Sequence, residues 1–195
     1  MKSLLTIILI TFGTSAYSQV VAENTLQKQI EEIQTAGQSA YSWDFNIDSF
    51  SNNYGLGAGL SSPHYWNGSI HFGLSGAYAW VPGVSKEGSS QAWKPYGLFR
   101  LGVYGGGYVV GTAIRIYGGG GPLLLIPSRS LSDRSAVGGG FGLAGVEFPL
   151  GRKSHSKAMY LEFGGMGSGA KADKMKDDPI YANGFLASWG FRYLF

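Results

Sequence analysis

The chain has 195 residues, enough for one domain, and its formal net charge of +3 is too small to indicate a nucleic-acid-binding protein. It contains no cysteine, which excludes both a disulfide framework and a lipid-modified cysteine. Charged residues form only 14% of the chain, whereas glycine contributes 32 residues and aromatics 14%. Ordinary soluble domains carry about 25% charged residues, so this composition favours a surface in contact with lipid.

The first 18 residues have the pattern of a cleaved secretory signal peptide. Lys2 supplies the positive start, residues 4–12 form a short apolar run, and the small residues Ala16 and Ser18 predict a mature chain that begins at Gln19. The alternative is a buried N-terminal strand or helix. Beyond this segment no apolar run approaches the length of a spanning helix. A mature chain that enters a membrane must therefore do so as a closed barrel.

Residues 19–40 are predicted to be a periplasmic N-terminal extension, either helical or disordered. Asn24 and Gln27 have capping-box spacing, and Leu26, Ile30 and Ile33 follow at helical spacing. The apolar stripe is narrow and the other faces are polar, so a loosely held segment is expected.

From residue 41 the apolar residues recur with a period of two, which is typical of strands. In 41–50, for example, Tyr41, Trp43 and Phe45 alternate with polar residues. Each run is close to the length that a tilted transmembrane strand needs, and outer-membrane barrels of bacteria have even strand numbers. The sequence therefore predicts an all-β fold, an eight-stranded antiparallel transmembrane β-barrel over residues 41–195. The predicted strands are 41–50, 54–60, 68–80, 92–104, 108–117, 140–148, 158–164 and 184–195.

The connections between these strands alternate in length. The long ones are 81–91, 118–138 and 169–183, and the short ones are 61–67, 105–107 and 149–157. Long loops on the extracellular side and short turns on the periplasmic side are the rule for such barrels. We therefore expect both ends of the chain in the periplasm. The connection near 51–53 is short and departs from this alternation.

The few charged residues in the predicted strands all lie on the face opposite the large apolar side chains. On that interpretation they point into the barrel, where a buried charge needs a partner of opposite sign. We predict an ion-pair network that fills the interior, with a pore lining or an active site as alternatives. Glycines on the same face (102, 145, 164 and 190) would make room for arginines or leave a small cavity. The predicted lumen charges are Asp44, Asp48, Arg100, Arg115, Glu147, Glu162 and Arg192.

Aromatic residues cluster near the predicted strand ends, where they would form the two belts at the membrane interfaces. Alternation alone does not separate this barrel from a soluble, lipocalin-like calyx. However, a soluble barrel places its lysines on the outer face of its strands, whereas here most lysines lie in the connections between the predicted strands. The predicted belt residues are Tyr41, Trp43, Tyr65, Trp66, Tyr78, Trp80, Trp93 and Tyr96.

The last strand, "GFLASWGFRYLF", carries aromatics at every second position and ends on Phe195. Its final residues resemble the C-terminal signal that the barrel-assembly machinery reads in bacterial outer-membrane proteins. Ser188, Gly190, Tyr193 and Phe195 occupy the polar, glycine, aromatic and terminal aromatic positions of that signal in order. The glycine-rich strands and the stretch from "GMGSGAKADK" to "FRYLF" are also similar to small outer-membrane barrels of Bacteroidetes-type bacteria. This resemblance implies a Gram-negative cell envelope and a family mostly without an assigned activity.

The loops are the first place to look for function, since such barrels often bind partners there. The apolar patch 123–126 could contact a partner or lipid acyl chains, or fold over the barrel mouth, and Arg129 and Arg134 could meet lipopolysaccharide phosphates. Loop 169–183 mixes aspartates and lysines and is expected to be solvated. The expected partners are outer-membrane lipid, lipopolysaccharide and the assembly machinery.

Two other functions are open at this point. A narrow, porin-like pore for small or apolar solutes is one. A lipid A-modifying acyl hydrolase is the other, with "SHSK" around His155 as its candidate centre. That stretch reads as a periplasmic turn, away from the outer leaflet, and the histidine–any–serine–asparagine pattern of the deacylases is absent. The sequence predicts no catalytic residue, metal site or cofactor.

Overall fold

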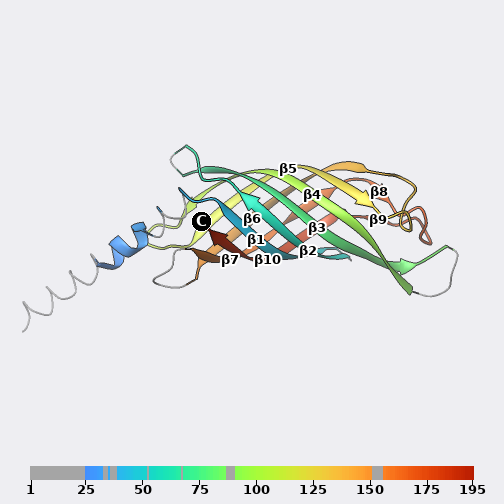
Figure 1. Ribbon diagram of the computed structural model, residues 1–195, viewed down its shortest axis with the longest axis horizontal. Coiled ribbons are helices and arrows are strands. Elements are labelled where there is room, and N and C mark those ends of the chain that lie inside the picture. Colours follow the sequence, from blue (N-terminus) through green and yellow to red (C-terminus); the bar gives the residue numbers. More distant parts are fainter. Residues whose placement is uncertain are drawn as a thin grey trace, which may run out of the picture.

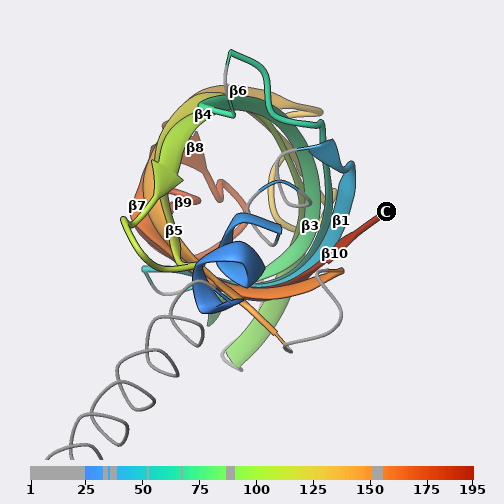
Figure 2. The same ribbon diagram turned by 90° about the vertical axis from the view of Figure 1, so that its left-hand side faces the viewer.

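A computed structural model describes residues 25–32, 35, 39–51, 53–66, 68–86, 91–150 and 156–195. Eight strands form a closed barrel in the order β1-β10-β7-β6-β5-β4-β3-β2, seen as a ring along its axis in Figure 2. A separate two-stranded sheet, β8-β9, lies at one end of the barrel (Figure 1). The strands are β1 Ser42–Phe50, β2 Asn53–Ser61, β3 Ile70–Val84, β4 Gln91–Tyr108, β5 Arg115–Pro127, β6 Val137–Pro149, β7 Lys157–Gly167, β8 Ala170–Lys171, β9 Ile180–Tyr181 and β10 Gly184–Leu194.

Every pair of neighbouring barrel strands is antiparallel, which confirms the predicted fold class. The ring closes between the first and last strands, where Ser42 pairs with Leu194 and Phe50 with Leu186. Just beyond this ladder the amide of Phe195 donates to the carbonyl of Tyr41 over 2.9 Å.

The two ends of the barrel differ. At one, which we call the loop end, lie the β1–β2 turn, residues 85 and 86, and residues 128–136 and 168–183. At the other, the terminus end, lie residues 62–66, 68, 69, 109–114, 150 and 156, together with the start of β1 and the end of β10. A short helix over residues 25–32 lies beyond the terminus end (Figure 1). It falls within the predicted extension, whereas the predicted signal peptide lies outside the described residues. No helix among the described residues is both long and apolar enough to cross a membrane.

The predicted boundaries of the central strands are wrong. The expected turn at 105–107 is part of β4, and the expected strand 108–117 is mostly the turn 109–114. Glycine runs predict turns, but here the glycines lie in the ladder where two backbones approach closely. A Cβ on Gly106 would lie 2.6 Å from Cα of Tyr117. Glycine in a strand often marks such an approach.

The predicted loop 118–138 is also wrong over its first half, because β5 runs from Arg115 to Pro127. The apolar run 123–126 is therefore not an exposed patch. Leu123 and Leu125 are buried inside the barrel, and Leu124 and Ile126 face outward. The loop itself is short, residues 128–136, and consecutive leucines reflect a strand with apolar side chains on both faces.

The connection near residue 51 is a tight hairpin, since Phe50 pairs with Asn53. Ser51 has a φ of 50°, in the left-handed region that a tight turn requires. The predicted division between the first two strands is therefore confirmed.

Candidate functional site

The outer face of the barrel is predominantly apolar. Phe45 of β1, Leu56 of β2 and Leu101 of β4 expose 56%, 57% and 54% of their surface. Among the described barrel strands the outward face carries one charged side chain, Lys157, at the terminus end. Its ammonium lies 5.7 Å from the ring centroid of Tyr193. Such a wall in water would be a very large exposed apolar patch.

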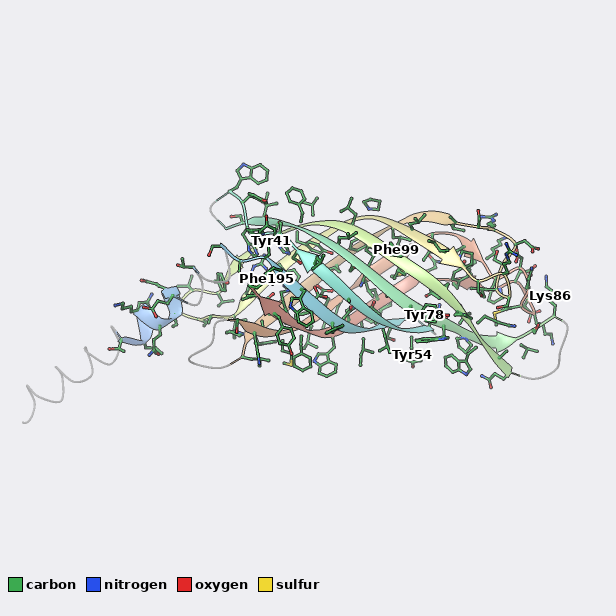
Figure 3. The ribbon with its side chains drawn as sticks, in the orientation of Figure 1. Tyr41, Tyr54, Tyr78, Lys86, Phe99 and Phe195 are labelled. Atoms are coloured by element: carbon green, nitrogen blue, oxygen red, sulfur yellow. The ribbon has the colours of Figure 1, made fainter. Side chains whose placement is uncertain are left out.

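Aromatic side chains gather on this face at both ends. At the terminus end Trp43 stacks on Tyr193, with ring centroids 4.6 Å apart, and Tyr41 lies beside Phe195 (Figure 3). At the loop end Tyr78 packs against Trp80 at 5.1 Å. These positions agree with interfacial belts. The belt prediction for Tyr96 is wrong, because this side chain is only 1% exposed and shares the inward face of β4 with Arg100.

The interior at the loop end is an apolar plug. Segment 168–183 folds inward, with Met175 and Tyr181 buried, and Leu131 joins them from the preceding loop. The ring of Tyr181 lies 4.9 Å from that of Tyr96, and burial together with Asp173 raises the pKa of the Tyr181 hydroxyl to about 12. The expectation of a solvated loop is therefore wrong. The sequence does not reveal the inward fold, because the apolar residues of this segment are spaced too irregularly to show a period.

The seven predicted lumen charges are all buried inside the barrel. Next to the apolar plug, Arg100 donates to Asp48 over 3.1 Å and to the hydroxyl of Ser75 over 3.0 Å. Asp48 also accepts from Asn46 and from Ser188. A fully buried carboxylate is thus surrounded by donors, as burial demands.

Towards the terminus end, one carboxylate serves two guanidiniums. Glu147 accepts from Arg192 and lies 4.0 Å from Nη1 of Arg115. Nη2 of Arg115 also lies 3.0 Å from Nδ1 of His71, which is itself buried. The strand register explains the grouping, since Arg115 and Glu147 are direct partners in the β5–β6 ladder.

The remaining two carboxylates bind tyrosines that sequence reasoning did not single out. The hydroxyl of Tyr117 donates to Glu162 over 2.8 Å, and that of Tyr160 donates to Asp44 over 2.9 Å. The guanidinium of Arg192 lies 4.8 Å from the ring centroid of Tyr160. Both tyrosines have the inward parity of their strands, so the alternation alone could have placed them in the lumen.

Three of the four inward glycines named above make room for tyrosine rings and not for arginines, whereas Gly164 lies against the backbone of β6. A Cβ on Gly145 would lie 2.6 Å from the ring of Tyr117, and one on Gly190 would lie 2.6 Å from the hydroxyl of Tyr160. Gly102 has the same relation to Tyr104, at 2.6 Å. Tyrosine over glycine is therefore a repeated packing unit of this lumen.

The space left among these groups is small. A cavity of about 30 Å³ lies between Asp44, His71, Arg100, Tyr104 and Arg192. A single water needs roughly 10–15 Å³ on this measure. No cluster of metal-binding side chains is found within the described residues. His155, the proposed centre of the hydrolase alternative, lies outside the described residues.

The fold and the inward charges define a class, the closed eight-stranded antiparallel barrel. The chain is similar in fold to the N-terminal β-barrel domain of Pseudomonas aeruginosa OprF, known from a crystal structure. The TM-score is 0.54 with 12% identity, over 82% of this chain and 99% of that domain. No protein-family model and no curated protein matches the chain. The comparison shows a shared fold.

Proposed function

We propose that the protein is an integral outer-membrane β-barrel with a closed interior, which acts as a structural or loop-mediated binding component of the cell envelope. The observation that carries this proposal is the distribution of charge. Seven charged side chains point into the barrel, whereas Lys157 alone lies on the outward face of the described strands. In a soluble barrel the polarity of the two faces would be reversed.

The proposal includes the exported location that the sequence predicts. The signal peptide would be cleaved after Ser18, and the terminus end would face the periplasm. Ser188, Gly190, Tyr193 and Phe195 would serve as the assembly signal of a Bacteroidetes-type barrel. In support, Tyr193 and Phe195 lie on the outer face at the terminus end, where such a signal is accessible before the barrel closes.

A closed interior is favoured over a pore because two different layers fill the lumen in series. The first layer is the apolar plug at the loop end, and the second is the network of ion pairs and tyrosines. The cavity of about 30 Å³ between the side chains of the second layer is far too small for a solute.

Conductance of the refolded protein in planar bilayers tests this proposal. We expect the wild type to be closed, and Arg100→Ala and Arg115→Ala to remain closed because the apolar plug is untouched. Conductance should appear when Arg100→Ala is combined with replacement of residues 169–183 by a short Gly–Ser linker. The variant that carries the linker without Arg100→Ala shows how much the apolar plug contributes to closure by itself.

Steady conductance of the wild type would contradict the closed barrel and favour the narrow pore. If the protein stays soluble without detergent and does not enter bilayers at all, the membrane assignment itself is wrong and the soluble calyx takes its place.

A further inference from the structure

A basic cleft lies at the loop end, separate from the lumen network. It has a volume of about 310 Å³ and is lined by Lys86, Lys94, Arg129, Lys174, Asp173 and the two serines 85 and 130. Pockets for small ligands begin at roughly 300 Å³. Lys86, just past the end of β3, marks its position in Figure 3. The cleft therefore has room for a small charged group.

Three loops build this cleft, and backbone hydrogen bonds join them to one another. The amide of Lys86 donates to the carbonyl of Lys174 over 3.1 Å. The amide of Lys174 donates in turn to the carbonyl of Leu131 over 3.3 Å. Ser128 is bonded in turn to Pro95 of β4 over 3.2 Å. Beneath them, Met175 and Leu131 are fully buried in the apolar plug. The cations are thus carried by a fixed framework, which lowers the entropic cost of binding.

The charges of the cleft are incompletely balanced. Lys86 pairs with Asp178 and Lys174 with Asp133, each over 2.6 Å. Both are exposed pairs, and such pairs contribute little and exchange partners easily. Lys94 and Arg129 have no ion-pair partner in the part of the chain that the structure describes.

The one carboxylate among the described residues that line the cleft is already engaged. Asp173 accepts from the hydroxyl of Ser132 over 3.1 Å and from the amide of Asp133 over 3.0 Å. Asp173 therefore fixes the loop, and none of these hydrogen bonds joins it to a lysine of the cleft. Among the described residues, the cleft is thus lined by two lysines in exposed ion pairs, two cations without an ion-pair partner and a single carboxylate.

We propose that this cleft binds a phosphate group. A planar guanidinium recognises phosphate oxygens through paired hydrogen bonds, and lysine ammonium groups add point charge. The hydroxyls of Ser85 and Ser130 offer further donors at the wall. A phosphate group carries more than one negative charge. It would therefore balance the cations of the cleft more completely than a ligand with one carboxylate group would.

The source of the phosphate is either a lipid head group or a free phosphate. Under the proposed function, on which this part of the inference rests, the loop end faces the outer leaflet and its phosphorylated lipids. The belt at this end, with Tyr78 and Trp80, would place the cleft near the head groups.

The first experiment is calorimetric titration of the full chain, refolded in neutral detergent, with inorganic phosphate and with pyrophosphate. We expect saturable binding at one site that weakens at least about tenfold in Lys94→Gln/Arg129→Gln. The matched control is Lys171→Gln/Lys176→Gln, which removes the same charge from the same end outside the cleft. It should change the affinity by less than about twofold, since screening limits distant charges.

Asp173→Asn tests the same site in the opposite direction, because loss of the lining carboxylate should tighten phosphate binding. Equal weakening in the two double variants would overturn the proposal, because only net charge would then matter. Absence of saturable binding in a folded wild type would overturn it as well. Heat-modifiable migration on gels establishes folding for each variant.

The second experiment separates the two sources. The detergent micelles are doped either with phosphatidic acid or with a fatty acid of similar charge, and competition against pyrophosphate is measured. Competition by phosphatidic acid alone supports the lipid source, whereas no competition by either supports free phosphate. Equal competition by the fatty acid would overturn specificity for phosphate. Failure to refold in any detergent would instead contradict the membrane function, so the two failures are distinguishable.

Discussion

At the scale of single residues, Glu147 is the lumen carboxylate that pairs with two arginines. Its carboxylate binds Arg192 and faces Arg115, and all three side chains are buried. A buried ion network contributes little net stability, but removal of one member leaves its partners uncompensated. The effect of a substitution here should therefore be large.

We predict that Glu147→Gln destabilises the barrel by about 3–5 kcal/mol, because two buried guanidiniums lose their counter-ion. Denaturant unfolding of the protein in lipid vesicles, followed by tryptophan fluorescence, measures this change. The control is Asp133→Asn, which breaks the exposed pair with Lys174 and should cost no more than about 1 kcal/mol. Similar losses for both variants would show that the lumen network is not specially important.

A second residue-scale prediction concerns the tyrosine-over-glycine packing. Gly145→Ala should destabilise by about 1–3 kcal/mol, because the added methyl overlaps a tightly packed ring. Tyr117 is 2% exposed and donates a hydrogen bond to Glu162, so its ring is held in place.

Gly142→Ala in the same strand is the control for this substitution. Its Cβ faces outward, and the nearest atom, the carbonyl oxygen of Gly119, lies 3.7 Å away. The same unfolding assay should find this variant neutral or slightly more stable, because alanine restricts the unfolded chain. Equal behaviour of the two variants would contradict the packing argument.

At the scale of elements, segment 168–183 joins two functions. Its inner side completes the apolar plug through Met175, and its outer side supplies Lys174 to the basic cleft. The isolated bridge between Ser85 and Met175 fixes the segment to the end of β3. Plug and cleft should therefore loosen together.

We predict that Met175→Ala accelerates tryptic cleavage within this segment, after Lys171, Lys174 or Lys176. Removal of a buried methionine side chain costs about 2–5 kcal/mol, and here the loss falls on a local element that can open by itself. Limited proteolysis of the refolded protein, with mass spectrometry of the fragments, measures the rate. Ile180→Ala, at an exposed position of the same segment, should leave it unchanged. A barrel that is cleaved at one rate in all three forms would contradict the plug.

The element scale also shows where sequence reasoning was sufficient. Alternation placed all seven lumen charges on the inward face, because period two is independent of register. It did not reveal which charges pair, because the partner of Glu147 depends on the register between strands. The predicted strand boundaries are wrong over residues 105–127, because the glycines there mark a close approach of two backbones and not a turn. The inward fold of segment 168–183 depends on tertiary contacts and has no local signal.

At the scale of the whole molecule, the proposal rests on which face of the barrel meets lipid. We predict that Leu101→Arg, in the middle of β4, destabilises the protein in bilayers by about 2–4 kcal/mol, the cost of a cation near the membrane midplane. The measurement is unfolding in vesicles. Val110→Arg, in the turn at the terminus end where the side chain is 97% exposed, is the control and should be nearly neutral. A soluble barrel would tolerate both substitutions equally.

The seam between β1 and β10 has a consequence for how this molecule folds. It pairs Ser42 with Leu194, residues that lie at opposite ends of the barrel sequence. Closure of so long a loop costs more chain entropy than any hairpin does, and contacts of this separation slow folding. Until the seam forms, two strand edges stay open and can pair with other chains. The interval before closure is thus when the protein is most exposed to aggregation.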